Sequence, residues 1–231
     1  MKYISFRLSG RYGHFKKPET NNNPLTYPFM HKPALIGLTG AVVGVNRPSM
    51  KKQFPGLCDG LGMALVLNKP VTKETHGFTS HKAVAGNFYG PGRVYNEFLR
   101  GPDYTVTIAL KNDSCNEFFS TFCCRIKNKK SGYPHYFGIS SCPAQVSFLN
   151  EGSLAEEKGL FKTTGIISSD HELKTIPDDT DIGTDRIPTY QDNNWYNPPD
   201  RFVSVLYYTG VTVEAFGSYY KKDNGECLWL I

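Results

Sequence analysis

Apolar and polar residues alternate at the start of the chain. Ile4, Phe6 and Leu8 are separated by polar residues, and this period of two predicts a strand with one buried face. Later apolar runs predict three more strands within the first 150 residues. They are residues 63–67 (MALVL), 104–110 (YTVTIAL) and 144–149 (AQVSFL).

Two segments show helical spacing. In the first, apolar residues recur every three or four positions after Pro33, which suits the first turn of a helix, and we expect Pro48 to end it. In the second, Asp113 or Ser114 is the expected cap and Gly132 the expected end. The apolar positions are Leu35, Leu38, Val42 and Val45 in the first helix and Phe118, Phe119, Phe122, Cys123 and Ile126 in the second.

Gly37, Gly40 and Gly44 form a second stripe on the first predicted helix. A glycine inside a helix costs about 1 kcal/mol relative to alanine, so a smooth helix surface must have a use. We favour close packing of this surface against a sheet. The alternative is close approach of a ligand backbone.

The predicted order is strand, helix, strand, insertion, strand, helix, strand. This order indicates an α+β fold with a ferredoxin-like (RRM-like) βαββαβ core over residues 1–150, in which residues 68–103 are a long insertion. Residues 151–231 are expected to be a β-rich extension or a degenerate second half. Its predicted strands are 161–168, 202–208, 212–219 and 227–231, and the acidic stretch 170–200 is expected to be a solvated, mobile loop.

Composition narrows the class of protein. The chain has 231 residues, 39% of them apolar, and its 22 Gly and 15 Pro predict many turns. No apolar run reaches the roughly 18 residues of a membrane span, and residues 1–10 do not resemble a signal peptide. The six Cys, at 58, 115, 123, 124, 142 and 227, form no CxxC pair. We therefore expect reduced thiols, a cytoplasmic location, no metal site and no cofactor.

Charge is unevenly distributed along the chain. Residues 1–52 carry nine Lys and Arg and one acid, Glu19, whereas the remaining residues carry 17 bases and 20 acids. A basic end on an acidic body favours a polyanionic partner.

Basic and aromatic residues are interleaved between Arg11 and Lys17. Single-stranded nucleic acid is held by cations along its phosphates and by rings stacked on its bases, and this segment offers both. The alternative is a solvated basic face whose rings fill the core. The candidate RNA-binding residues are Arg11, Tyr12, His14, Phe15, Lys16, Lys17, Tyr27, His31, Lys32, Gly37, Gly40, Arg47, Lys82, Arg93 and Arg100.

Catalytic motifs are absent from the sequence. The glycines of GLTGAVVG fit neither a dinucleotide fingerprint nor a Walker A loop, and no HExxH or GxSxG motif occurs. Histidines at 14, 31 and 81 could act as general acids or bases in RNA cleavage. If the protein is an enzyme, Tyr27, His81 and Lys82 are the candidate catalytic residues. We favour a protein without catalytic residues.

Residues 6–44 resemble the N-terminal signature of CRISPR-associated RAMP proteins of the Cas-five family, type I-B branch. The resemblance lies in HFKK at 14–17, PLTYPF at 24–29 and GLTGAVVG at 37–44, with a weaker similarity at 138–148 (GISSCPAQVSF). The last third of the chain matches only loosely.

The resemblance implies a ferredoxin-like core with a β-hairpin thumb, for which residues 68–103 are the candidate. It implies binding to the 5′ handle of CRISPR RNA (crRNA) inside the Cascade antiviral complex. The backbone subunit and the large subunit would be its partners, target DNA would be met only through the complex, and no membrane would be involved. Some relatives cleave repeat RNA without metal, with a Tyr at the place of Tyr27, but His81 and Lys82 occur in reversed order here. A generic RNA-binding or scaffold protein is a third possibility.

Overall fold

The computed structural model describes residues 1–231 except 21–22, 81–82, 85–86 and 89–91. Its core sheet places four strands in the order β9-β1-β8-β3, and each neighbouring pair is antiparallel. The first strand thus lies between the third and fourth, as in a ferredoxin-like βαββαβ fold, so the predicted fold class is confirmed. The strands are β1 (Lys2–Gly10), β3 (Leu61–Leu67), β8 (Asp103–Leu110) and β9 (Ala144–Thr163).

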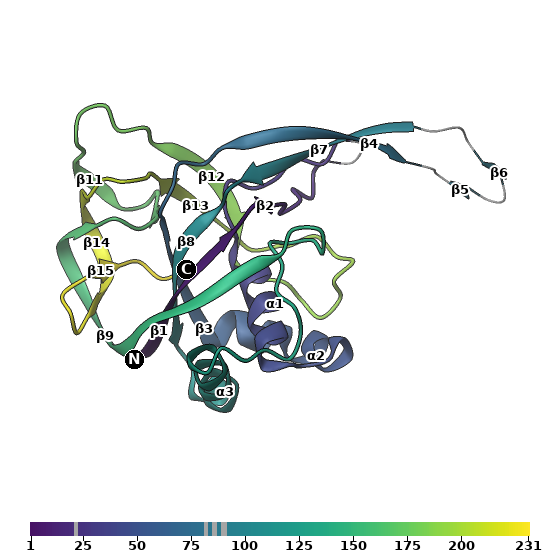
Figure 1. Cartoon of the computed structure of the whole chain (residues 1–231). Coiled ribbons are helices and arrows are strands. Elements are labelled where there is room, and N and C mark those ends of the chain that lie inside the picture. Colours follow the sequence, from purple (N-terminus) through teal and green to yellow (C-terminus); the bar gives the residue numbers. More distant parts are fainter. Residues whose placement is uncertain (21–22, 81–82, 85–86, 89–91) are drawn as a thin grey trace.

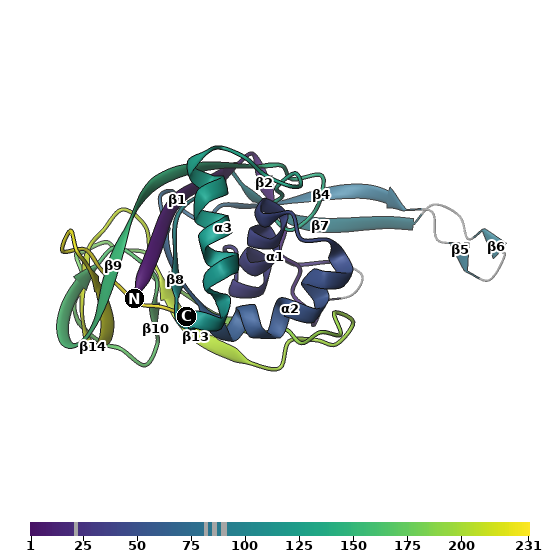
Figure 2. The same ribbon diagram turned by 90° about the horizontal axis from the view of Figure 1, so that it is seen from below.

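Three helices cover one face of this sheet (Figure 2). Ile4, Phe6 and Leu8 of β1 point into the core below them, and Phe6 packs edge-on against Phe122 with ring centroids 5.7 Å apart. The alternation at the start of the chain therefore predicted the buried face correctly. The helices are α1 (Lys32–Val43), α2 (Arg47–Gly60) and α3 (Asn116–Lys127), the last preceded by a 3-10 turn, Asp113–Cys115.

Helix α2 is an element that the sequence pattern did not predict. Helix α1 ends at Gly44, whose φ of 76° is left-handed, and not at Pro48. Asn46 then caps α2 by accepting a hydrogen bond from the Ser49 amide at 3.0 Å, and Pro48 lies in the first turn of α2. Proline at this position starts a helix because its missing N–H is not needed there.

The glycine stripe of α1 serves close packing at Gly40 and, against Gly132, at Gly44. A Cβ on Gly40 would lie 2.5 Å from the sulfur of Met50, so this glycine lets α2 pack closely against α1. At Gly40 the packing partner is therefore helix α2, whereas we had expected the sheet. Gly44 forms the helix end, and Gly37 is exposed with open space beside it.

The insertion forms a long antiparallel hairpin that projects from the core (Figure 1). Its strands pair from Lys73 with Leu99 near the core out to Ser80 with Gly92. Short strand β2 pairs with the core end of β7 and completes a three-stranded sheet. The elements are β2 (Tyr12–Gly13), β4 (Lys73–Ser80), β5 (Ala83–Val84), β6 (Asn87–Phe88) and β7 (Gly92–Arg100).

The rest of the chain is rich in strands, as predicted. Strand β9 continues past residue 150 to pair with β14, and a separate sheet has the order β10-β13-β12. Two strands, β11 and β12, lie in the stretch 170–200 that we expected to be a mobile loop, so that expectation was wrong. The division of the chain at residue 150 stays a prediction. The elements are β10 (Ile167–Ser168), β11 (Glu172–Thr175), β12 (Gly183–Pro188), β13 (Phe202–Tyr207), β14 (Val213–Lys222) and β15 (Cys227–Leu228).

Candidate nucleic-acid interface

The pairing of β2 with β7 brings two arginines to the core end of the hairpin. Tyr12 pairs with Arg100, and the amide of Gly101 donates a 2.8 Å hydrogen bond to the main-chain oxygen of Arg11. Both arginine side chains are exposed, and the guanidinium of Arg11 lies 5.6 Å from the ring centroid of Tyr12. Two cations and one ring predicted from sequence are therefore neighbours. We call Arg11, Tyr12 and Arg100 the hairpin base.

Aromatic rings extend from the hairpin base along one face of the hairpin. His76 contacts Tyr12 edge-on at 5.3 Å between centroids and Phe98 at 5.3 Å, and Phe78 lies 6.0 Å from Phe98. Phe98 is buried, whereas Phe78 remains 46% exposed at the outer end. The row ends in a ring that a base could stack on. We call Tyr12, His76, Phe78 and Phe98 the aromatic row.

One carboxylate lies within this surface. Glu74 accepts a hydrogen bond from His76 Nε2 at 2.7 Å and lies 3.8 Å from the Arg100 guanidinium. The bond from His76 holds the pKa of Glu74 below its usual value. Glu74 therefore stays ionised and offsets part of the positive charge of Arg100. Arg11 has no such carboxylate partner within the described residues, so its charge is the more available of the two.

A cleft of about 440 Å³ opens beside Arg11 at the end of β1. Arg7 and Lys69 add two cations to its lining, and Asp103 adds one acid. Arg7 donates two hydrogen bonds to Asp103, through Nε at 2.9 Å and Nη2 at 2.5 Å. These bonds lower the pKa of Asp103, so the pair keeps opposite charges. Three cations against one acid leave the cleft positive, as phosphate binding requires.

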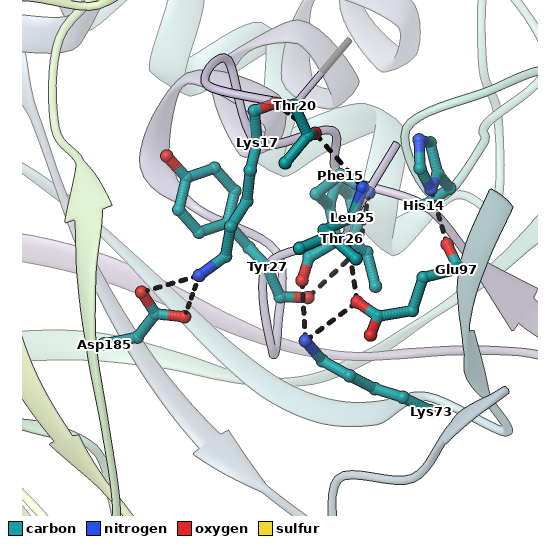
Figure 3. Close-up of polar contacts among 10 residues, drawn as sticks. All are labelled: His14, Phe15, Lys17, Thr20, Leu25, Thr26, Tyr27, Lys73, Glu97 and Asp185. Atoms are coloured by element: carbon teal, nitrogen blue, oxygen red, sulfur yellow. Dashed lines mark hydrogen bonds and ion pairs between the residues drawn. The ribbon is translucent and has the colours of Figure 1, made fainter. Parts of the chain in front are cut away.

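The loop that follows β2 is tied to the hairpin (Figure 3). His14 Nδ1 donates to the main-chain oxygen of Glu97 at 2.7 Å, and the Glu97 carboxylate accepts the Thr26 amide at 3.0 Å. Lys73 donates to both the Thr26 oxygen at 2.8 Å and Glu97 at 3.0 Å. These bonds hold the hairpin at a defined place on the core.

Lys17 does not offer a free charge. Its ammonium donates to both carboxylate oxygens of Asp185 on β12, at 2.8 and 3.0 Å (Figure 3). The acidic stretch that contains Asp185 was expected to be mobile surface and instead neutralises this lysine. Lys16 is exposed and forms no ion pair within the described residues.

Two rings predicted to face RNA are part of the core. Phe15 and Tyr27 are each 2% exposed, and Phe15 packs on Phe137 at 6.2 Å between centroids. Gly138 lies over this segment, and its φ of 85° and its contact with the main-chain oxygen of His14 exclude a side chain there. A ring that stacks on a base must reach solvent. For these two residues the structure therefore agrees with the alternative in which the rings fill the core.

Lys32 is buried and its neighbour His31 is partly buried. His31 caps α1 by accepting a hydrogen bond from the Ala34 amide at 3.3 Å, and desolvation lowers its pKa to about 3. Lys32 is 5% exposed, its ammonium donates to the main-chain oxygen of Ile231 at 2.9 Å, and burial lowers its pKa to about 8. A neutral imidazole and a buried ammonium do not bind phosphate at the surface. RNA binding by His31 and Lys32 stays a prediction, and their hydrogen bonds inside the protein do not favour it.

The remaining candidates lie apart from the hairpin base. Arg47 belongs to α2, where its guanidinium lies 5.6 Å from the ring centroid of Trp195, and Arg93 is exposed farther out on β7. Gly37 and Gly40 belong to α1. His81 and Lys82 lie outside the described residues.

Five residues of this surface were not among the candidates from sequence, namely Arg7, Lys69, His76, Phe78 and Phe98. Residues 68–103 show no sustained alternation of apolar and polar positions, because both faces of the projecting hairpin meet solvent over most of its length. A local signal that the sequence does offer is the Gly101-Pro102 pair after Arg100, because Gly-Pro marks a turn between two strands.

Two classes of site have no support within the described part of the chain. No group of three or more His, Cys, Asp or Glu side chains gathers there in a way that could hold a metal ion. No helix in that part combines the length and apolar character needed to cross a bilayer.

Comparisons with known proteins place the fold. No protein-family model and no curated protein sequence matches the chain. A crystal structure of a CRISPR protein from Archaeoglobus fulgidus has a TM-score of 0.63 at 10% identity, with 99% of this chain and 98% of that chain covered. A chain of a CRISPR RNA-guided surveillance complex has a TM-score of 0.56 at 13% identity, with 93% and 91% covered. The chain therefore shares its fold with these two structures over nearly its whole length.

Proposed function

We propose that this protein is an RNA-binding subunit of a CRISPR RNA-guided complex and caps the 5′ handle of the crRNA, as in a type I-B Cascade. The observation that carries the proposal is the hairpin base, where Arg11 and Arg100 lie exposed on paired strands with the ring of Tyr12 beside them. The shared fold with a chain of an RNA-guided surveillance complex supports the same assignment. Phosphates would bind the two arginines and the cleft, and a base would stack on the aromatic row.

The partners follow from this role. A handle-binding subunit sits at one end of the guide, so the Cascade backbone subunit and the large subunit are its proposed neighbours. Target DNA would be met only through the assembled complex. These assignments rest on the family resemblance together with the shared fold.

We also propose that the protein holds RNA without cleaving it. Tyr27, one of the candidate catalytic residues, is 2% exposed, and burial raises its pKa to about 12. A phenol in this setting neither reaches a 2′-hydroxyl nor gives up its proton near neutral pH. Incubating the protein with repeat RNA in EDTA tests this, because specific cleavage that is lost in Tyr27→Phe would favour the metal-independent endoribonuclease.

The test of the binding site is the double variant Arg11→Glu with Arg100→Glu. Two charge-assisted contacts are replaced by repulsion, so affinity for handle RNA should fall at least about a hundredfold. Neutral replacements, Arg11→Gln with Arg100→Gln, should lower the slope of log affinity against log salt by about 1.4. Fluorescence anisotropy with labelled handle RNA measures both.

The matched control is Lys158→Glu with Lys221→Glu, two exposed cations on β9 and β14. It makes the same change in net charge and should alter affinity by less than about threefold. Equal losses in both double variants would mean that net charge, and not the hairpin base, binds RNA. Equal affinity for handle and scrambled RNA would favour the generic RNA-binding protein.

A further inference from the structure

A second surface combines cations with an exposed ring, on α2 and the loop between β12 and β13. The loop lies across α2, where Trp195 packs edge-on against Phe54 with ring centroids 5.4 Å apart. The guanidinium of Arg47, at the start of α2, lies 5.6 Å from the centroid of the Trp195 ring. These contacts fix the loop along positions 47 and 54, two turns apart on the same face of the helix.

The loop is held in shape by its own hydrogen bonds. The Asp192 carboxylate accepts the Asn194 amide at 2.8 Å and the Asn197 side chain at 2.7 Å, and Asn194 Nδ2 donates to Asn197 Oδ1 at 3.0 Å. The main-chain amide of Asn197 closes the turn on the Asn194 oxygen at 2.8 Å. Two neutral amide donors thus direct the Asp192 carboxylate into the loop.

Tyr196 occupies the tip of this turn and is 90% exposed, the highest exposure among the large apolar and aromatic residues that the structure describes. Lys51 lies beside it, with Nζ 5.8 Å from the ring centroid. A ring anchored by a rigid turn loses little conformational entropy on binding. It is therefore prepared to stack on a planar group that arrives from solvent.

Three cations lie in the first half of α2, and one of them, Lys51, flanks the ring. Arg47, Lys51 and Lys52 form no ion pair within the described residues, and Arg47 and Lys51 are spaced i, i+4 on one side of the helix. The acid at the far end of the helix, Asp59, is paired with Arg201 at 2.9 Å. The ammonium of Lys51 beside an exposed ring, with Arg47 and Lys52 on the same helix, complements a chain of phosphates that carries bases.

We infer that α2 and the Tyr196 turn form a second binding surface, for a single strand of nucleic acid, separate from the hairpin base. The strand would place phosphates on Arg47, Lys51 and Lys52 and stack one base on Tyr196. Such contacts read no base edges, so binding does not depend on sequence. The surface goes beyond handle capping, since its ligand is any single strand that reaches it.

The test uses the full chain in the Arg11→Glu, Arg100→Glu background, so that the hairpin base does not mask the second surface. Labelled oligo(U) and oligo(dT) are the probes, and their two affinities separate RNA from DNA as the strand that is bound. The background protein should retain measurable binding. Adding Tyr196→Ala should weaken it about tenfold, whereas Tyr196→Phe keeps the ring and should bind like the background.

A charge variant gives an independent readout. Lys51→Gln with Lys52→Gln should lower the slope of log affinity against log salt by about 1.4, the value for two phosphate contacts on a single strand. Tyr196 is solvent-exposed, so the thermal midpoint of Tyr196→Ala should match that of its parent. A 5-iodouracil probe crosslinked by ultraviolet light should attach to Tyr196, as located by mass spectrometry.

Three outcomes would overturn the inference: no binding by the background protein, no effect of Tyr196→Ala, or crosslinks confined to the hairpin. If this surface binds a partner protein instead of nucleic acid, one of these three outcomes would be observed. The outcome is distinct from that of the proposed function. If Arg11→Glu with Arg100→Glu leaves handle binding intact, the proposed site fails while Tyr196→Ala still decides the second surface.

Discussion

The hairpin base and the start of α1 have the same kinds of residues and opposite environments. Arg11, Tyr12 and Arg100 are exposed or half-buried on paired strands. Tyr27, His31 and Lys32 also combine a ring with basic groups, and the rings of Tyr27 and His31 touch edge-on at 5.1 Å. In the second group, Tyr27 and Lys32 are buried and His31 is partly buried. The same composition therefore supports a ligand surface in one place and structure in the other.

The difference lies in desolvation. Burial disfavours a charged group unless a partner replaces the lost water, so the pKa values of His31 and Lys32 both fall. Arginine keeps its charge in almost any protein environment, and at the hairpin base it is also solvated. A basic residue thus predicts phosphate binding only where water can reach it.

The largest effect that tests this comparison is expected for two rings that are close in the sequence, one in the core and one at the surface. Phe15→Ala removes a ring that is 2% exposed and should lower the free energy of unfolding by about 3–5 kcal/mol. RNA affinity of the folded fraction should not change. Tyr12→Ala should lose less stability but weaken handle binding about tenfold. Urea denaturation and anisotropy measure the two effects, and the reverse pattern would show that Phe15 faces RNA.

A second test compares the stability of variants at a buried lysine, Lys32, and at an exposed one, Lys16. Lys32→Ala removes one of the two donors to the Ile231 oxygen, the other being the Met63 amide, and opens a cavity, so the free energy of unfolding should fall by about 2–4 kcal/mol. Lys32→Met fills the space without a buried charge and should cost less. The control Lys16→Ala, at an exposed position, should change stability by less than about 0.5 kcal/mol. Similar losses at 16 and 32 in urea denaturation would contradict the assignment of Lys32 to the core.

His31 supplies a smaller effect that depends on pH. Its pKa is about 3 in the folded protein and about 6.5 when unfolded, so below pH 6.5 the unfolded state binds a proton that the folded state excludes. Its contribution to stability is therefore complete above pH 6.5 and is lost as pH falls toward 3, at no more than about 1.4 kcal/mol per pH unit.

His31→Asn keeps a capping acceptor and removes this titration. The variant should differ from the parent protein by a constant amount above pH 7.5, and the difference should shift in its favour as pH falls. Urea denaturation at a series of pH values measures it. A constant difference down to pH 4 would mean that His31 is protonated freely in the folded protein.

Several elements were predictable because their signal is local. The alternation of Ile4, Phe6 and Leu8 and the β-branched run 104–110 each predict a half-buried or buried strand without reference to the rest of the chain. Helix α2 was missed although its signal is local too. Asn46 and Pro48 have the order of a cap followed by a first-turn proline, and the apolar run before them suggested a helix end instead.

Within the candidate interface, Arg11, Tyr12 and Arg100 were found from sequence and the aromatic row only in part. His76 comes next to Tyr12, and Phe78 next to Phe98, through the pairing of β2 with β7 and of β7 with β4. No local pattern specifies that register, because the hairpin is solvated on both faces and lacks the alternation that a buried face imposes.

By itself, the sequence determined the period of the strands and helices, the fold class and the basic character of the first fifth of the chain. Only the tertiary structure decided which of those cations meet water. Lys17 is neutralised by Asp185, 168 residues away, and Lys32 is enclosed beside Ile231, 199 residues away. The physical reason is that the charge state and reach of a side chain depend on solvation and on partners, and both are set by contacts between residues distant in the chain.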